Sequence, residues 1–352
     1  MTHPRIALQA ASLAPSLPVC DHYCGVETRM RKSLALQTEL SGLHGHCVFD
    51  VTLDCEDGAP VGAEADHARA IASLVESLFA SNPAQAARMH RVAVRVHPVD
   101  HPAFADDVEL IVGRVGRHLC HVMLPKVDSV QQVERALALL DVAAQRGGRE
   151  QPLPLHVLVE SPQAVQVVDA IVAHPRVESA SFGLMDFVSA HGGSIPACAM
   201  QVDDAPFGTA LDQFGHPLVL RAKLALAAAC HAYAKVPSHC VVTEFKDTQR
   251  LLRAARHAAR ALGYTRMWSI HPDQIRPILQ AFAPEQHEVA QASAIVWAAY
   301  RADWAPLSRD GQLHDRASYR YYWHVLQRAH QTGVLAPNDA CQVFFQHNGA
   351  SI

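Results

Sequence analysis

Two acidic residues each end a short apolar run of the sequence. Glu160 follows the run "LHVLV" at 155–159, and Asp186 follows the run "VESASFGLM" at 177–185. If these runs are successive parallel strands, their carboxyl ends meet at one edge, and the two carboxylates lie close together. Two unpaired anions repel each other, and two carboxylates completed by waters and substrate oxygens are the ligands that Mg²⁺ prefers. The pair therefore predicts a magnesium site, although a single acid at a strand end is more often a helix cap.

Two cationic side chains also end apolar runs. Arg95 lies in "RVAVRVHP" at 91–98, and its planar donors suit a substrate carboxylate or a developing enolate oxygen. The alternative for Arg95 is a structural ion pair with Glu56 or Asp57. Lys126, in "HVMLPKV" at 121–127, has its own alternative role as a Schiff-base lysine. A metal pair and a Schiff base are two different ways to stabilise the same carbanion.

Short β-branched runs alternate along the chain with longer segments of helical period, which favours βα units around a parallel sheet. This spacing predicts a (β/α)8 TIM barrel with a C-terminal helical extension. An open doubly wound sheet is the alternative, but the first βα turn has no Gly-x-Gly-x-x-Gly fingerprint. The expected strands are 16–22, 46–54, 91–98, 121–127, 155–160, 177–185, 239–245 and 266–272. The expected helices are 63–81, 129–145, 161–174, 217–234, 247–263 and 273–282.

Two segments depart from a minimal barrel. Residues 189–216 form a long loop rich in Gly, Pro and Asp, and loops of that length are usually lids or binding elements. We assign residues 1–285 to the barrel and residues 286–352 to a helical cap or oligomerisation segment. This last segment is expected to contain a helix, an irregular stretch and a final helix near 318–332.

Composition excludes several classes of function. The chain has 352 residues, of which 49% are hydrophobic and 18% charged, so it can bury a sizeable core. Its net charge of −4 gives no sign of the basic surface that binds the phosphates of nucleic acid. No apolar run approaches the roughly 20 residues that a membrane helix needs. We therefore expect a cytoplasmic protein that binds neither nucleic acid nor membrane.

Cysteine and histidine spacing does not signal a structural metal site. The nine cysteines are odd in number and scattered, without a Cys-x-x-Cys pair, so neither a disulfide framework nor a zinc site is indicated. The 23 histidines lack the helical His-Glu-x-x-His pattern of zinc proteases.

The chemistry-bearing blocks occur together in an order that resembles a known family. They read "TLDCEDG", "VRVHPVD", "VMLPKVDS", "VLVESPQAV", "SFGLMDF", "TEFKD" with "ALGYTRMWSIHPDQI", and "RDGQLHD". This series, over roughly residues 47–318, is similar to the HpcH/HpaI aldolase and citrate lyase β-subunit-like family. The resemblance implies a (β/α)8 barrel, a trimer or hexamer, and magnesium-dependent cleavage or formation of carbon–carbon bonds. Its members often act on acyl-CoA thioesters such as citryl-, malyl- or citramalyl-CoA.

The resemblance also implies roles for individual residues. Glu160 and Asp186 match the two magnesium ligands, and Arg95 matches the arginine that binds the oxo-acid or thioester oxygen. Asp315 matches an aspartate that some members send into a neighbouring subunit's site as acid or base. Glu56 and Asp57 match an acidic pair that supports the arginine and the water molecules bound to the metal.

Three departures from the family pattern surround the expected mouth of the barrel. The first strand reads "LPVCDHYCG" in place of an Arg-Ser-x-x-x-x-Pro-Gly strand, His97 stands where asparagine is common, and loop 189–216 is longer. Because this is where relatives hold the CoA phosphates, the chemistry is better supported than the identity of the substrate.

The sequence thus predicts a Mg²⁺-dependent carbon–carbon lyase acting on a hydroxy acid or its CoA thioester, in a homotrimer or hexamer. A CoA-independent 2-oxo-acid aldolase and a non-catalytic barrel subunit are the alternatives. The predicted catalytic residues are Arg95, Glu56 and Asp315. The predicted substrate-binding residues are Arg95, Asp57 and Lys126.

Overall fold

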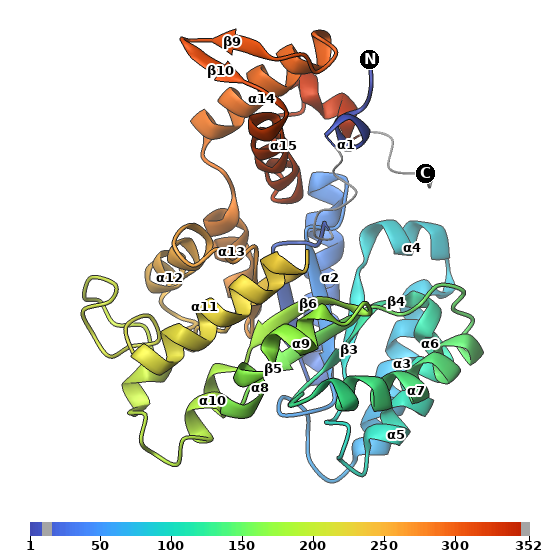
Figure 1. Cartoon of the computed structure of the whole chain (residues 1–352). Helices are drawn as coiled ribbons and strands as arrows, with labels where there is room; N and C mark the ends of the chain where they lie inside the picture. The colour runs from blue at the N-terminus through green and yellow to red at the C-terminus, as the bar shows by residue number, and fades with distance from the viewer. Residues whose placement is uncertain (9–15, 346–352) are drawn as a thin grey trace. The chain divides into compact units, whose positions relative to one another are not determined.

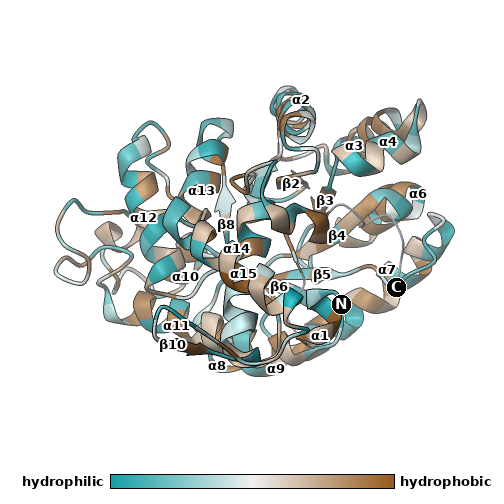
Figure 2. Ribbon diagram, turned by 90° about the horizontal axis from the view of Figure 1, so that it is seen from above, coloured by the Kyte–Doolittle hydropathy of each residue, from teal (hydrophilic) through white to brown (hydrophobic). Residues whose placement is uncertain are grey.

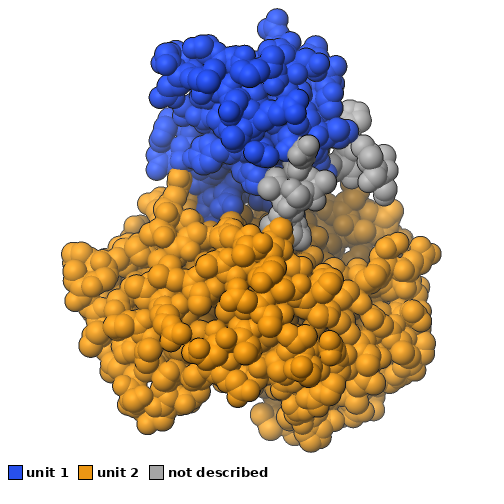
Figure 3. Space-filling view, viewed as in Figure 1, with its two compact units in different colours: residues 1–16, 282–352 blue, residues 17–281 orange. Residues whose placement is uncertain are grey.

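The structure is a computed structural model that describes residues 1–8 and 16–345. The chain divides into two compact units (Figure 3). The larger unit comprises 17–281, and the smaller unit joins 1–16 to 282–352. The sequence-based division at 285 placed the start of the chain with the barrel, whereas residues 1–8 belong to the smaller unit.

Eight parallel strands close into a barrel in the larger unit, each hydrogen-bonded to its neighbours in sequence order and β8 to β1. This is the expected (β/α)8 fold (Figure 1). The strands are β1 (Cys20–Cys24), β2 (Phe49–Asp54), β3 (Val92–Arg95), β4 (Leu119–Leu124), β5 (Leu155–Val159), β6 (Val177–Phe182), β7 (Val236–His239) and β8 (Arg266–Ser269).

Amphipathic helices cover the outside of the barrel. Serine and aspartate begin several of them as the sequence would predict: Ser129, Ser161 and Asp247 each accept a hydrogen bond from a backbone N–H in the first turn. Helix α12 carries both hydrophilic and hydrophobic residues (Figure 2), and its buried residues are Leu251, Leu252, Ala254, Ala255 and Ala258. The helices of this unit are α2 (Glu27–His44), α3 (Glu64–Ala80), α4 (Pro83–Met89), α5 (Phe104–Asp107), η2 (Val108–Val112), α6 (Gly113–Val115), η3 (Gly116–His118), α7 (Val130–Arg146), α8 (Pro162–Gln166), α9 (Val168–Ala173), α10 (Leu184–Ser189), η4 (Ala197–Met200), α11 (Pro217–Ala232), α12 (Thr248–Arg260), η5 (Pro272–Gln274) and α13 (Ile275–Phe282).

The seventh strand lies earlier than the sequence indicated. The β-branched run at 239–245 suggested a strand there, but β7 is Val236–His239, and the chain turns away at Cys240. Pro237 lies within this strand, although proline cannot donate a hydrogen bond to a ladder. Its carbonyl instead accepts a hydrogen bond from the backbone N–H of Thr265.

Alternate residues of each strand point into the barrel, and many of these are polar. On β2, Asp50, Thr52 and Asp54 are two residues apart, so their side chains share one face. The Thr52 hydroxyl donates to Asp21 on β1 at 2.8 Å. One strand thus carries polar groups at three levels of the interior.

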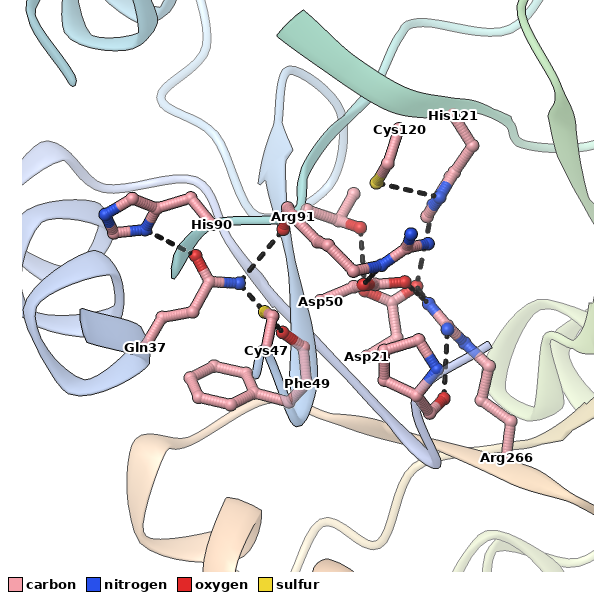
Figure 4. Close-up of polar contacts among 12 residues, drawn as sticks. Asp21, Gln37, Cys47, Phe49, Asp50, His90, Arg91, Cys120, His121 and Arg266 are labelled. Atoms are coloured by element: carbon pink, nitrogen blue, oxygen red, sulfur yellow. Dashed lines mark hydrogen bonds and ion pairs between the residues drawn. The ribbon is translucent and has the colours of Figure 1, made fainter. Parts of the chain in front are cut away.

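Near the N-terminal ends of the strands, a buried charge network crosses the barrel (Figure 4). Arg266 on β8 contacts Asp50 at 2.7 Å and Asp21 at 2.9 Å, and Arg91 donates to the other oxygen of Asp50 at 2.6 Å. Burial alone would raise the pKa of Asp50, but the two guanidinium groups outweigh burial and hold that pKa below its usual range. Buried pairs of this kind give the interior a specific arrangement and leave a costly charge if one partner is removed.

The smaller unit has its own apolar core, built from aromatic and aliphatic residues such as Trp304, Tyr319 and Trp323. Residues 307–314 of the stretch expected to be irregular form a two-stranded hairpin. The final helix, expected near 318–332, is α15. The elements of this unit are α1 (Pro4–Ala7), α14 (Gln286–Arg301), β9 (Leu307–Arg309), β10 (Gln312–His314), α15 (Arg316–Gln331) and η6 (Ala340–Phe344).

Within the described residues, none of the helices combines the length and the apolar character needed to cross a membrane.

The charge network predicts that Arg266→Met lowers the free energy of unfolding by about 3–5 kcal/mol, because Asp21 loses its cation and Asp50 loses one of two. Chemical denaturation measures this change. Arg276→Met is the control, since Arg276 pairs with Glu39 on the exposed surface and should contribute little. Equal stability of the Arg266 variant and the wild type would contradict the role of the network.

Candidate active site at the C-terminal mouth of the barrel

Glu160 follows β5 directly and continues the inward-facing series of that strand. His156, Leu158 and Glu160 are spaced two residues apart, so the carboxylate enters the mouth of the barrel. Its side chain is buried. Gly183 leaves the necessary room, because a Cβ atom at that position would lie 2.4 Å from Cγ of Glu160. Ser161 and Pro162 begin α8, so the helix cap is supplied by serine and not by Glu160.

Asp186 lies close enough to Glu160 to affect its ionisation. Asp186 is in the first turn of α10, and 41% of its side chain is exposed. Burial, and then the negative charge of Asp186, raise the pKa of Glu160 to about 8. A buried carboxylate beside a second carboxylate is a donor set that a hard divalent cation would stabilise, so these residues fit Mg²⁺.

Arg95 ends β3 and is held by acids of the neighbouring strand. Its Nε atom donates to Asp54 at 2.6 Å, a second nitrogen contacts the other oxygen of Asp54 at 2.5 Å, and Nη1 lies 2.9 Å from Glu56. Burial alone would lower the pKa of Arg95, but these acids outweigh it and raise that pKa. The guanidinium also lies over the ring of Tyr23, 5.0 Å from its centroid. The ion pair expected as the alternative role of Arg95 is therefore present, with Asp54 and Glu56 as partners.

Lys126 joins the two groups of acids. Its ammonium group hydrogen-bonds to Glu56, and it lies 3.3 Å from Asp57 and 3.9 Å from Asp186. Burial alone would lower the pKa of Lys126, but the hydrogen bond to Glu56 and the negative charges of Glu56, Asp57 and Asp186 outweigh burial and raise that pKa. A raised pKa keeps the amine protonated, which opposes the nucleophilic role that a Schiff-base lysine requires.

An apolar group lies beside these charges. Met123, Leu158, Val241 and Trp268 form a buried cluster, and Tyr23 packs against it. The rings of Tyr23 and Trp268 meet edge to face with their centroids 5.0 Å apart. Apolar side chains beside charged groups lower the local dielectric, which strengthens the electrostatic interactions there.

The structure therefore brings together Arg95, Glu56, Asp57, Lys126, Glu160 and Asp186. Asp315 belongs to the smaller unit, where it caps α15 by accepting hydrogen bonds from the N–H groups of Ala317 and Ser318. Its action at the barrel mouth stays a prediction. Glu244 lies in the run that was expected to be the seventh strand, but it follows β7 and accepts a hydrogen bond from the backbone N–H of Val202 in the long loop.

Sequence reasoning assigned no role to two members of the cluster. Asp54 was visible beside Glu56 in "LDCED", but nothing in the pattern showed that it, and not Asp57, would pair with Arg95. Tyr23 was missed because the first strand was expected to end at residue 22. The spacing of Asp21 and Tyr23 on β1 was the available signal, since both lie on the inward face.

A second group of potential metal ligands lies in the buried network at the opposite end of the strands. Donor atoms of Asp50, Cys120 and His121 lie within 4.8 Å of one another (Figure 4). Both oxygens of Asp50 already accept hydrogen bonds from Arg91 and Arg266. Because the two guanidinium groups oppose a further cation, we assign this group to the stability of the fold.

A (β/α)8 barrel with clustered acids and an arginine at its C-terminal mouth belongs to the class of barrel enzymes that build their active sites there. The family model for HpcH/HpaI aldolase/citrate lyase matches residues 44–272. The chain belongs to this family.

Named relatives and solved structures agree with the family assignment. An L-malyl-CoA/β-methylmalyl-CoA lyase of Cereibacter sphaeroides is 28% identical over 248 residues, which are 70% of this chain and 75% of the relative. A crystal structure of a citrate lyase from Burkholderia xenovorans is 46% identical, with a TM-score of 0.76, over 97% of this chain and 100% of the other. The CitE protein of Mycobacterium tuberculosis, crystallised with magnesium, acetoacetate and coenzyme A, shares the fold at 22% identity and a TM-score of 0.59, over 89% and 98% of the two chains.

The ion pairs of Lys126 predict that this lysine forms no Schiff base. Treatment with pyruvate and sodium borohydride should leave the intact mass of the protein unchanged, because the amine stays protonated. Mass spectrometry measures the outcome. A reduced adduct mapped to Lys126 would contradict this assignment and favour the other class of aldolase.

Proposed function

We propose that the protein is a magnesium-dependent carbon–carbon lyase that cleaves or forms a hydroxy acid, or its CoA thioester, by retro-aldol or retro-Claisen chemistry. The observation that carries this proposal is the buried carboxylate of Glu160 beside Asp186, with Arg95 among the neighbouring acids. Membership of the HpcH/HpaI aldolase/citrate lyase family supports the reaction class.

Glu160 and Asp186 are the residues that would hold Mg²⁺. The ion, when bound, supplies positive charge that stabilises oxygens of the oxo-acid half as negative charge develops on them. Glu160 directly follows β5, and Asp186 lies in the first turn of α10, which follows β6. Because β5 and β6 are neighbours in the barrel, the barrel fixes the separation of the two acids.

Arg95 binds the substrate oxygen on which the enolate charge develops. Arginine has five N–H donors, and the contacts with Asp54 and Glu56 use three of them. One N–H group remains on each of the two terminal nitrogens. The ion pairs fix the orientation of these two groups, which donate hydrogen bonds to an oxo-acid or thioester oxygen. Asp54 and Glu56 therefore orient Arg95 for an incoming substrate, which is the pre-organisation that electrostatic catalysis requires.

The other predicted residues act around this centre. Glu56 links Arg95 to Lys126, and Asp57 lies at the rim, where 61% of its side chain is exposed to solvent. Asp315 moves the proton as acid or base.

The substrate is proposed to be a CoA thioester of the malyl, citryl or citramalyl type. The named relatives from Cereibacter sphaeroides and Chloroflexus aurantiacus act on malyl-CoA and related esters, as their names state. We also propose a cytoplasmic homotrimer or hexamer in which residues 286–352 contribute subunit contacts. Scattered cysteines without a pairing pattern support the reducing compartment.

Removing either metal ligand should abolish metal-dependent turnover. Glu160→Gln or Asp186→Asn should each lower kcat/KM by more than about a hundredfold, because the amide cannot replace the carboxylate charge. Steady-state kinetics with added Mg²⁺, together with circular dichroism, separates lost chemistry from lost fold. Glu76→Gln is the matched control, since Glu76 pairs with Arg114 on the exposed surface. Full wild-type activity in EDTA would contradict the proposal.

A small substrate panel separates the CoA-ester lyase from its alternatives. The panel contains malyl-, citramalyl- and citryl-CoA, with release of acetyl-CoA monitored, and a parallel assay of pyruvate with an aldehyde. The proposal predicts cleavage of at least one CoA ester. Turnover of free oxo acids alone would favour a CoA-independent aldolase. Failure of the wild type to bind Mg²⁺ in calorimetry would favour a non-catalytic barrel.

A further inference from the structure

Lys126 has a backbone conformation that residues with a Cβ atom avoid. Its φ angle is +52°, in the left-handed region, and it follows Pro125 at the end of β4. Among the described residues, the other non-glycine positions with positive φ are Ala234, Asp303, Trp304 and Asp310. Lys126 alone among these five takes part in the cluster of acids at the barrel mouth. An unfavourable conformation at a functional site persists only when surrounding contacts impose it.

The left-handed turn directs the backbone of Lys126 at Glu160. The amide N–H of Lys126 donates to Oε1 of Glu160 at 3.1 Å. The next amide, that of Val127, donates to the carbonyl of Leu158 on β5 at 3.3 Å. The turn after β4 is therefore attached to the end of β5 by two successive amides, and the first of them reaches the side chain of Glu160.

Glu160 has little freedom to move away from this amide. On another side it meets Gly183, where even a Cβ atom would collide with the Glu160 side chain. The buried carboxylate is thus confined between the amide of Lys126 and the backbone of Gly183. Its position depends on the conformation of both neighbours.

The side chain of Lys126 acts on different acids from its backbone. The ammonium contacts Glu56, Asp57 and Asp186, and none of these contacts involves Glu160. These ion pairs hold the residue in place at the mouth of the barrel. They supply the surrounding contacts that impose this conformation on a residue with a Cβ atom.

We propose that Lys126 is a positioning residue: its left-handed backbone fixes Glu160 as a metal ligand, and its ammonium group holds the backbone in that conformation. The inference rests on the proposed function, in which Glu160 and Asp186 bind Mg²⁺. It replaces the predicted substrate-binding role of Lys126 with a role inside the protein.

The test compares Lys126→Gly with Lys126→Ala. Both variants lack the ammonium group and therefore have the same charge, but only glycine adopts positive φ without a steric penalty. We expect Lys126→Gly to bind Mg²⁺ about fivefold more tightly than Lys126→Ala, because alanine lets the turn relax and releases Glu160. Isothermal titration with Mg²⁺ alone measures the two dissociation constants, so the readout does not depend on turnover. Equal affinities of the two variants, or tighter binding by the alanine variant, would overturn the inference.

Two further variants keep the comparison decisive. Lys126→Asn tests the same point if the glycine variant fails to fold, because asparagine tolerates the left-handed region better than alanine and should bind Mg²⁺ more tightly than it. Ala234→Gly is the control, since it removes a left-handed alanine that lies before β7 and outside the acid cluster. Its affinity for Mg²⁺ should equal that of the wild type. A rise in affinity of this control as large as the glycine–alanine difference would also overturn the inference.

The wild-type titration distinguishes failure of the inference from failure of the proposed function. If the wild type binds no Mg²⁺, the proposed function fails and the inference fails with it. If the wild type binds Mg²⁺ and the glycine and alanine variants bind it equally, the metal site stands and only the positioning role of Lys126 is wrong.

Discussion

The repulsion among carboxylates at one end of the barrel is the constraint on which the site depends. Two cations lie between these acids and form an alternating series, in which Asp54 pairs with Arg95, Arg95 with Glu56, and Glu56 with Lys126. Glu160 has no cationic side chain within hydrogen-bond distance among the described contacts, and burial raises its pKa to about 8. The series balances one part of the site. At the other part, burial and the charge of Asp186 disfavour the ionised form of Glu160, so a divalent cation there would stabilise that form.

The barrel separates stability from function along its strands. On β2, Asp50 takes part in the buried network with Arg266, while Asp54, four residues later, orients Arg95 at the opposite end. Both side chains point inward because strand residues alternate between faces. The same geometry therefore places structural ion pairs near the N-terminal ends of the strands and chemistry at their C-terminal ends, as expected for this fold.

Much of this arrangement could be predicted from the sequence. The period of the apolar runs predicted the barrel, and Glu160, Asp186 and Arg95 were recognised because each ends such a run. The exact partner of Arg95 could not be predicted, since it depends on how side chains cross between strands. The positive φ of Lys126 also has no local signal, because tertiary contacts impose it on a residue type that usually avoids it. The predicted position of β7 was wrong because the β-branched run at 239–245 has the residue pattern of a strand although it lies outside the barrel.

If Glu160 and Asp186 are the metal ligands, a divalent ion binds between them. Diffraction from crystals grown with Mn²⁺, a substitute for Mg²⁺ that is located by its anomalous scattering, shows where the ion binds. We expect an anomalous peak within coordination distance of both carboxylates. A peak beside Asp50, Cys120 and His121, or no peak at the mouth of the barrel at saturating Mn²⁺, would contradict this expectation.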